Sequence, residues 1–139
     1  MRRLFCSLIL LVAAGTACGD GGTGPKGSLT GTYALSTVDA RTLPIVFYED
    51  ADYKVEILSG SFVVNGASTF TETIAIRETD STGPLVTTAV CAGTYTRSGN
   101  SLTLTEPETN DCGGTYTAAW DGSNKLSVDY GGVVAVYKR

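Results

Sequence analysis

The sequence contains no histidine, and its 139 residues include only one methionine and one tryptophan. Without an imidazole there is no histidine base for proton transfer, and the commonest nitrogen ligand of zinc is missing. No serine or cysteine lies in the strand-to-helix turn that exposes a catalytic nucleophile. We therefore expect no enzyme activity, no metal site and no cofactor.

Basic residues are also scarce, with 10 Lys and Arg against 14 Asp and Glu. Arg2 and Arg3 belong to an N-terminal segment that we expect to be removed, which leaves 8 basic residues and a net charge of about −6. Nucleic-acid binding depends on clustered Lys and Arg that neutralise phosphates. A nucleic-acid partner is therefore not expected.

A hydrophobic run long enough to cross a membrane is absent as well, since a spanning helix needs roughly 20 apolar residues. The longest apolar run, Leu4–Ala14, follows two arginines and precedes the small residues Gly15, Thr16 and Ala17. This three-part arrangement is typical of an export signal. We expect residues 1–17 to be a signal peptide and exclude them from the fold.

Cys18 follows these small residues directly, and Gly15-Thr16-Ala17-Cys18 resembles the lipobox of bacterial lipoproteins. The resemblance implies acylation of Cys18 and a protein held by this lipid on a membrane of the cell envelope, on the periplasmic side or at the outer membrane in a diderm host. Gly15 stands where the family usually has an aliphatic residue, and an ordinary secretory signal with an incidental Cys18 is the alternative. Residues 18–28, rich in glycine, predict a flexible tether.

Two of the four cysteines lie in this N-terminal region. Cys6 leaves with the signal and Cys18 takes the lipid, so Cys91 and Cys112 remain as one possible pair. In an oxidising compartment they predict a disulfide, which stabilises by roughly 3 kcal/mol for a loop of about 20 residues. A reactive or metal-binding thiol pair is the alternative, and the long separation and the lack of histidine argue against it.

Residues 29–139 predict a single all-β domain, because no window shows sustained helical periodicity. Short segments rich in Thr, Val, Tyr and Ile alternate with the Gly, Asn, Asp and Ser of tight turns. The expected strands are 30–38, 53–59, 61–65, 69–78, 86–97, 101–106, 114–120, 124–130 and 133–138. Such a series predicts a meander of short hairpins.

The turns also predict which side chains share a face. Pairing Ser98 with Ser101 places Tyr95 opposite Leu104 on an apolar face, and the threonines point to the other side. The same parity sets Tyr116, Ala118 and Trp120 against Leu126, Val128 and Tyr130. The motif Gly-Thr-Tyr occurs three times: it opens the first strand at Gly31, and at Gly93 and Gly114 it is followed by a turn and a returning strand.

One apolar face has to be buried, and a meander buries it by closing on itself, which also removes exposed edges. We therefore predict a small antiparallel up-and-down β-barrel of about eight strands. The start Gly31-Thr32-Tyr33, the long first loop and the basic end Lys138-Arg139 resemble the lipocalin-like domains of bacterial lipoproteins. The resemblance implies a barrel that is open at one end and has a cavity for a hydrophobic ligand.

The inward-facing side chains are the candidate ligand contacts, namely Tyr95, Tyr116, Trp120, Val128 and Glu72. Glu72 shares the parity of its apolar neighbours on the strand, so a regular strand points it into the barrel. A buried carboxylate needs a partner, for which Arg97 or a tyrosine hydroxyl is available. A position at the rim or on a β-bulge avoids this cost, and it is the one that we favour from the sequence.

The connection Asp39–Asp52 is predicted to be long and irregular, and such loops are often functional. Its apolar stretch Leu43–Tyr48 is expected either to close the barrel mouth as a ligand lid or to plug the core. Glu49, Asp50 and Asp52 lack the order of ligands that a calcium loop requires, so we expect a solvated acidic loop.

Two functions stay open on these grounds. The first is a membrane-anchored lipoprotein whose barrel binds a small hydrophobic ligand. The second is a structural or interaction lipoprotein of the cell envelope, with a solid core and no ligand. The volume inside the barrel distinguishes them, because apolar side chains can fill a small barrel completely.

Overall fold

The computed structural model describes residues 27–109 and 112–139, and in these two segments it shows strands and turns but no helix. The same segments accordingly hold no helix long and apolar enough to cross a membrane. The predicted signal peptide and Cys18 lie outside the described residues. The strands are β1 (Gly31–Val38), β2 (Arg41–Thr42), β3 (Ile45–Glu49), β4 (Lys54–Val64), β5 (Thr69–Asp80), β6 (Gly83–Ser98), β7 (Ser101–Thr109), β8 (Cys112–Trp120), β9 (Lys125–Asp129) and β10 (Val134–Lys138).

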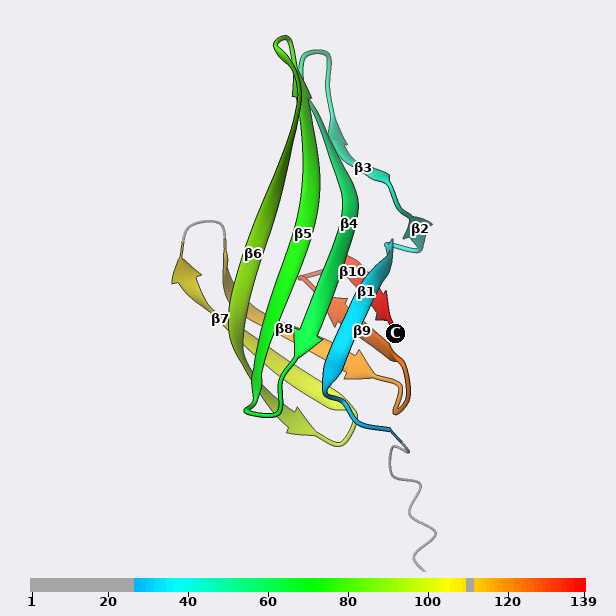
Figure 1. The fold of residues 1–139 in the computed structure, drawn as a ribbon, viewed down its shortest axis with the longest axis vertical. Helices are drawn as coiled ribbons and strands as arrows, with labels where there is room; N and C mark the ends of the chain where they lie inside the picture. The colour runs from blue at the N-terminus through cyan, green and yellow to red at the C-terminus, as the bar shows by residue number, and fades with distance from the viewer. Residues whose placement is uncertain (1–26, 110–111) are drawn as a thin grey trace, which may run out of the picture.

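Eight of these strands form a closed antiparallel barrel in which neighbours along the chain are neighbours in the sheet (Figure 1). β4 to β10 follow one another as a meander. β1 closes the ring, because it pairs with β10 through Ala34–Val38 and with β4 through Gly31–Ala34. The predicted all-β up-and-down barrel is thereby confirmed, and β2 and β3 are added beside β1 and β4.

The hairpin between β6 and β7 shows how the turns set the register. Gly99 has a φ of 61°, a left-handed conformation that glycine adopts without a steric penalty. Ser98 consequently pairs with Ser101, and Tyr95 lies opposite Leu104. Both pairings were predicted from the turn residues and are confirmed.

β4 is one continuous strand, and the prediction of two strands at 53–59 and 61–65 is wrong. Gly60 does not end a strand, since it pairs with Ile74 within the β4–β5 ladder. A Cβ atom at Gly60 would lie 2.8 Å from Ile74 Cδ1 and 3.1 Å from Leu35 Cδ2. The glycine therefore serves close packing inside the barrel and is not a turn residue.

The segment Asp39–Asp52 is more regular than predicted, because it contains β2 and β3. β3 pairs along the outer part of β4, with Ile45 opposite Ile57. Ile45 is buried in the core. Its burial favours an extended strand here, because β-branched side chains pack well on a half-buried strand. The expected irregular loop is thus largely an extra edge strand.

One end of the barrel is filled with side chains. We call it the closed end; it is the end where β1 begins and where β4 turns into β5. The most deeply buried side chains of the barrel are Trp120, Tyr33, Tyr137, Phe62, Phe70, Leu104, Leu126 and Val128. Phe62 and Phe70 stack with 5.0 Å between their ring centroids. The core at the closed end is therefore solid.

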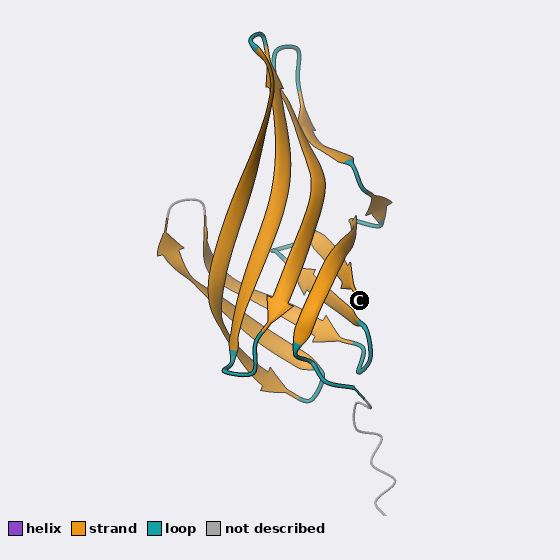
Figure 2. Ribbon diagram, viewed as in Figure 1, coloured by secondary structure: helices purple, strands orange, loops and turns teal. Residues whose placement is uncertain are grey.

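At the opposite end, β4, β5 and β6 extend well beyond β9 and β10 (Figure 2). They have 11, 12 and 16 residues, whereas β9 and β10 have 5 each. Together with β3 they form a four-stranded sheet that rises above the ends of β9 and β10. We call this sheet the overhanging sheet.

A disulfide joins Cys91 of β6 to Cys112 at the start of β8, as predicted, with 5.6 Å between the two Cα atoms. The β6–β7 ladder reaches only from Ser98 to Thr94. Cys91 lies just beyond the end of that ladder. The disulfide therefore holds the β7–β8 hairpin against β6 where backbone pairing between β6 and β7 has ended.

Candidate ligand-binding site

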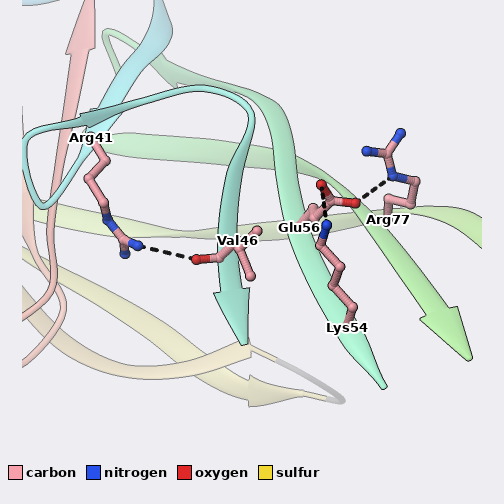
Figure 3. A network of polar contacts seen from close by, with 5 residues as sticks. All are labelled: Arg41, Val46, Lys54, Glu56 and Arg77. Carbon is pink, nitrogen blue, oxygen red and sulfur yellow. Dashed lines mark hydrogen bonds and ion pairs between the residues drawn. The ribbon is translucent and has the colours of Figure 1, made fainter. Parts of the chain in front are cut away.

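The overhanging sheet carries a network of charged side chains on the outer face of β4 and β5. Glu56 of β4 lies opposite Arg77 of β5, and the Glu56 Oε2 atom is 2.7 Å from Arg77 Nε (Figure 3). Lys54 Nζ approaches the other carboxylate oxygen at 3.2 Å, and Arg41 donates a hydrogen bond of 3.2 Å to the Val46 carbonyl. The hydrogen bond from Arg77 lowers the pKa of Glu56. The charged side chains of this network thus lie outside the barrel.

The inner face of the same sheet presents aliphatic side chains to an open cavity of about 430 Å³, which we call the mouth cavity. Its apolar lining consists of Leu35, Val38, Phe47, Val55, Ile57, Ile74, Ile76, Val133 and Ala135. Three polar side chains, Glu72, Tyr130 and Tyr137, complete it. The cavity is open because β4 and β5 continue past the ends of the shorter strands that face them.

Glu72 forms the polar floor of the mouth cavity together with the two tyrosines. Its side chain is 8% exposed, and its Oε1 atom accepts a hydrogen bond of 2.6 Å from the Tyr130 hydroxyl. The Tyr137 hydroxyl donates to the same oxygen. Burial raises the pKa of both phenols, and the neighbouring Glu72 raises it further. Both hydroxyls therefore stay protonated and remain donors to the carboxylate.

A second carboxyl group, that of Glu106 on β7, lies close to this floor. Glu106 is 6% exposed, and its Oε2 atom accepts a hydrogen bond of 3.3 Å from the Gly113 N–H. Burial raises the pKa of Glu106, and the charge of Glu72 raises it further. The region around the floor is thus acidic, and the twelve residues that line the cavity include no Lys or Arg.

Glu72 points into the barrel, as a regular strand would place it, and the rim or bulge position that we favoured from the sequence is wrong. Glu72 lies in regular register between Phe62 of β4 and Cys91 of β6. Tyrosine hydroxyls are its partners, one of the two possibilities considered. Arg97, the other, lies over the Trp120 ring at 5.0 Å and donates to the Gly99 carbonyl.

The other four predicted ligand contacts do not line the mouth cavity. Trp120 and Val128 are buried in the solid core. Tyr95 and Tyr116 each donate a hydroxyl hydrogen bond to a backbone carbonyl, at 3.1 Å to Asn65 and 2.5 Å to Gly113. Tyr33, in the first Gly-Thr-Tyr motif, likewise donates to the Leu29 carbonyl at 2.7 Å. In all three copies of the motif, the tyrosine hydroxyl thus donates a hydrogen bond to a backbone carbonyl.

Tyr116 still contributes indirectly, because its ring packs edge-on against Tyr130 at 5.0 Å between centroids. Sequence reasoning missed Tyr130 and Tyr137 as partners of Glu72. It also missed the aliphatic side chains that β4 and β5 present to the cavity. Part of this lining could have been predicted, because Ile74 and Ile76 lie two and four residues after Glu72 and therefore point to the same side of β5.

The segment predicted as lid or plug contributes to both the cavity and the core. Phe47 lines the mouth cavity, while Ile45 is buried and Leu43 packs against the core. In the acidic stretch, Asp50 accepts hydrogen bonds from the backbone N–H groups of Asp52 and Tyr53, which lower its pKa. Asp50 thus closes the turn between β3 and β4.

The fold and the cavity define a class of protein, a closed eight-stranded antiparallel up-and-down β-barrel domain with an apolar mouth. Comparison with known proteins adds no family to this class: no protein-family model matches the chain, and no curated protein matches it. The geometry of the mouth is what bears on function.

Proposed function

We propose that this domain is a binding protein, without enzyme activity, for a small hydrophobic or amphipathic molecule that occupies the mouth cavity. One observation carries the proposal: an open cavity of about 430 Å³ with nine apolar lining residues and one polar cluster on its floor. Ligand pockets typically measure about 300–1,000 Å³ and combine an apolar lining with a few placed polar groups. The mouth cavity has both properties.

Solvation gives a physical reason for a ligand at this position. Apolar surface that stays in water forgoes about 25 cal/mol per Å² of burial free energy. Ile57 and Ile74 are only partly buried, and Phe47 at the mouth is 55% exposed. A ligand body placed between these side chains covers them without any change in the barrel.

We propose further that the protein is a lipoprotein of the cell envelope, with signal peptide 1–17, acylated Cys18, tether 18–28 and barrel 29–139. The lipobox-like sequence before Cys18 supports this. The described chain enters the barrel at the closed end, where Gly27 N–H donates to the Gly122 carbonyl at 3.1 Å (Figure 1). An anchor at Cys18 would therefore attach to the barrel at the closed end and leave the mouth cavity free.

Native mass spectrometry of protein extracted from its own membrane tests the binding role. We expect a co-purifying small molecule, and we expect Ile76→Trp to lose it because the indole fills the mouth cavity. Val90→Trp is the matched control, since Val90 is 58% exposed and does not line the cavity. Wild-type protein that carries no adduct and binds no apolar fluorescent probe would contradict the proposal.

A second candidate, an interaction lipoprotein of the envelope, is favoured by the edge of β6. Leu85, Val86 and Val90 are 58–60% exposed, and from Gly83 to Gly93 the strand pairs only with β5 among the described residues. Uncovered apolar edge strands are sites where partner strands add. A photo-crosslinking residue at Val86 in intact cells would give one reproducible protein adduct if this candidate is correct.

A further inference from the structure

The floor of the mouth cavity has one carboxylate oxygen, Glu72 Oε2, that accepts no hydrogen bond from the described residues. Both tyrosine hydroxyls donate to the other oxygen, Glu72 Oε1. An ionised carboxylate has about four lone-pair positions for donors. Glu72 lines the cavity, so a donor carried by the ligand can occupy the position that the protein leaves open.

The charge at the floor is negative and has no basic neighbour in the cavity lining. The phenols of Tyr130 and Tyr137 are neutral donors, and Glu106 lies nearby as a second carboxyl. A carboxylate taken out of water is costly unless a cation pairs with it. An anionic head group would meet repulsion at the floor, whereas a cationic head group would supply the missing partner.

We propose that the ligand is an amphiphile with a cationic amine head, which donates N–H hydrogen bonds to Glu72 Oε2 while its apolar body lies against Ile57, Ile74 and Ile76. This inference rests on the proposed binding function and names the chemical class of the ligand. The aliphatic side chains of β4 and β5 determine where the apolar body of the ligand lies. The negative charge of the carboxylate favours a positively charged head group.

A series of three probes with the same alkyl chain tests the inference by titration calorimetry at pH 7: octylamine, octanol and octanoate. The ammonium of octylamine pairs with the carboxylate as an ion, whereas the octanol hydroxyl donates only a neutral hydrogen bond; a difference of about 1.4 kcal/mol between the two is equivalent to a tenfold change in Kd. We expect octylamine to bind at least about tenfold more tightly than octanol, and octanoate to bind most weakly. If octanol or octanoate binds as tightly as octylamine, the amine inference is wrong and the binding function stands. If none of the three binds, the binding function itself fails.

Glu72→Gln then assigns the preference to one residue. The glutamine keeps an oxygen acceptor for the two tyrosines and removes the charge. We expect octylamine to lose its tenfold advantage over octanol. Glu56→Gln is the matched control, because Glu56 lies on the outer face of the same sheet, and it should leave all three affinities as they are. A preference for octylamine that survives in Glu72→Gln would overturn the assignment. The comparison of the three probes on wild-type protein needs no variant, so it decides the inference even if Glu72→Gln does not fold.

Discussion

At the residue scale, Glu72 is the side chain on which both the core and the proposed site depend. Its two donors come from the end of the chain, 58 and 65 residues away, so the carboxylate is satisfied only once the barrel has closed. A buried acceptor that loses a donor keeps the cost of its desolvation. Hydrogen bonding at the floor is therefore tied to the folding of the whole barrel.

Tyr137→Phe removes one of these donors without changing the shape of a side chain that is fully buried. Because hydrogen bonds to charged groups contribute about 1.5–3 kcal/mol, we expect the free energy of unfolding in urea to fall by roughly 2 kcal/mol. Tyr48→Phe is the control, since its hydroxyl bonds Asp50 on an exposed turn, and it should change stability little. Equal effects of the two variants would contradict this role of Tyr137.

Glu106 gives a prediction with a defined pH dependence. Its pKa is raised in the folded state by burial and by Glu72, and its carboxyl in turn raises the pKa of Tyr116 and Tyr137. Below the ordinary carboxyl pKa of 4.5 the group is protonated in both states and has no effect. As the pH rises, the unfolded chain ionises first, so the folded state loses stability until the pH passes the raised pKa.

Glu106→Gln cannot ionise and should escape this loss. We expect its Tm to exceed that of the wild type at pH 7, with the difference disappearing at pH 4. Glu108→Gln, on the exposed part of the same strand, should show no such pH-dependent difference. A Glu106→Gln variant that is no more stable than wild type at pH 7 would show that ionised Glu106 contributes to the fold.

At the element scale, the short hairpins were predictable and the long strands were not. A turn such as Gly99 fixes the pairing of Ser98 with Ser101 locally, so the sequence alone predicts it. The need for glycine at position 60 cannot be inferred from the neighbouring sequence. It arises because Ile74 and Leu35 approach Gly60 from other strands. Continuous β4 could not be inferred without those contacts.

The candidate site was predictable to the same limited extent. Alternation along β5 gives Glu72 the inward parity, because side-chain direction in a strand has a period of two, but the cost of a lone buried carboxylate favoured a rim or bulge position. Its tyrosine partners depend on the closure of β10 against β1, which is a long-range event. The mouth cavity depends on how far β4 and β5 outreach β9 and β10, and no residue pattern within one strand encodes that difference. Trp120 and Val128 were therefore expected at a ligand although they fill the core.

Gly93 allows a test of close packing between strands. A Cβ atom there would lie 2.2 Å from the Thr105 carbonyl oxygen and 2.9 Å from the Phe70 ring. The backbone oxygen cannot move aside cheaply, so Gly93→Ala should lower the free energy of unfolding by roughly 3 kcal/mol. Gly66→Ala is the control, because a Cβ atom at Gly66 meets nothing within 4 Å. A Gly93→Ala variant as stable as the control would mean that β6 and β7 can separate at this point.

At the scale of the whole molecule, the two ends of the barrel have different tasks in the proposed function. The closed end receives the chain: Leu29 is buried there, and Arg139 donates to the Thr30 carbonyl at 2.9 Å. The mouth lies at the far end, under the overhanging sheet. From Cys18 to Gly27 the chain has nine residue steps, which span at most about 30 Å when extended. In the proposed lipoprotein, an anchor at Cys18 would therefore leave the mouth cavity unobstructed.

Cys18→Ser tests this separation of anchor and barrel. The variant lacks the thiol that would be acylated, so we expect it to leave the membrane fraction and to lose labelling by a radioactive fatty acid. Each acyl methylene contributes about 0.8 kcal/mol to membrane binding, and the variant loses this contribution because it carries no acyl chain. Because the described fold begins at Gly27, the urea midpoint and the Cys91–Cys112 disulfide should be unchanged. Wild-type protein that takes up no label and is found in the soluble fraction would instead indicate a secreted barrel with an incidental Cys18.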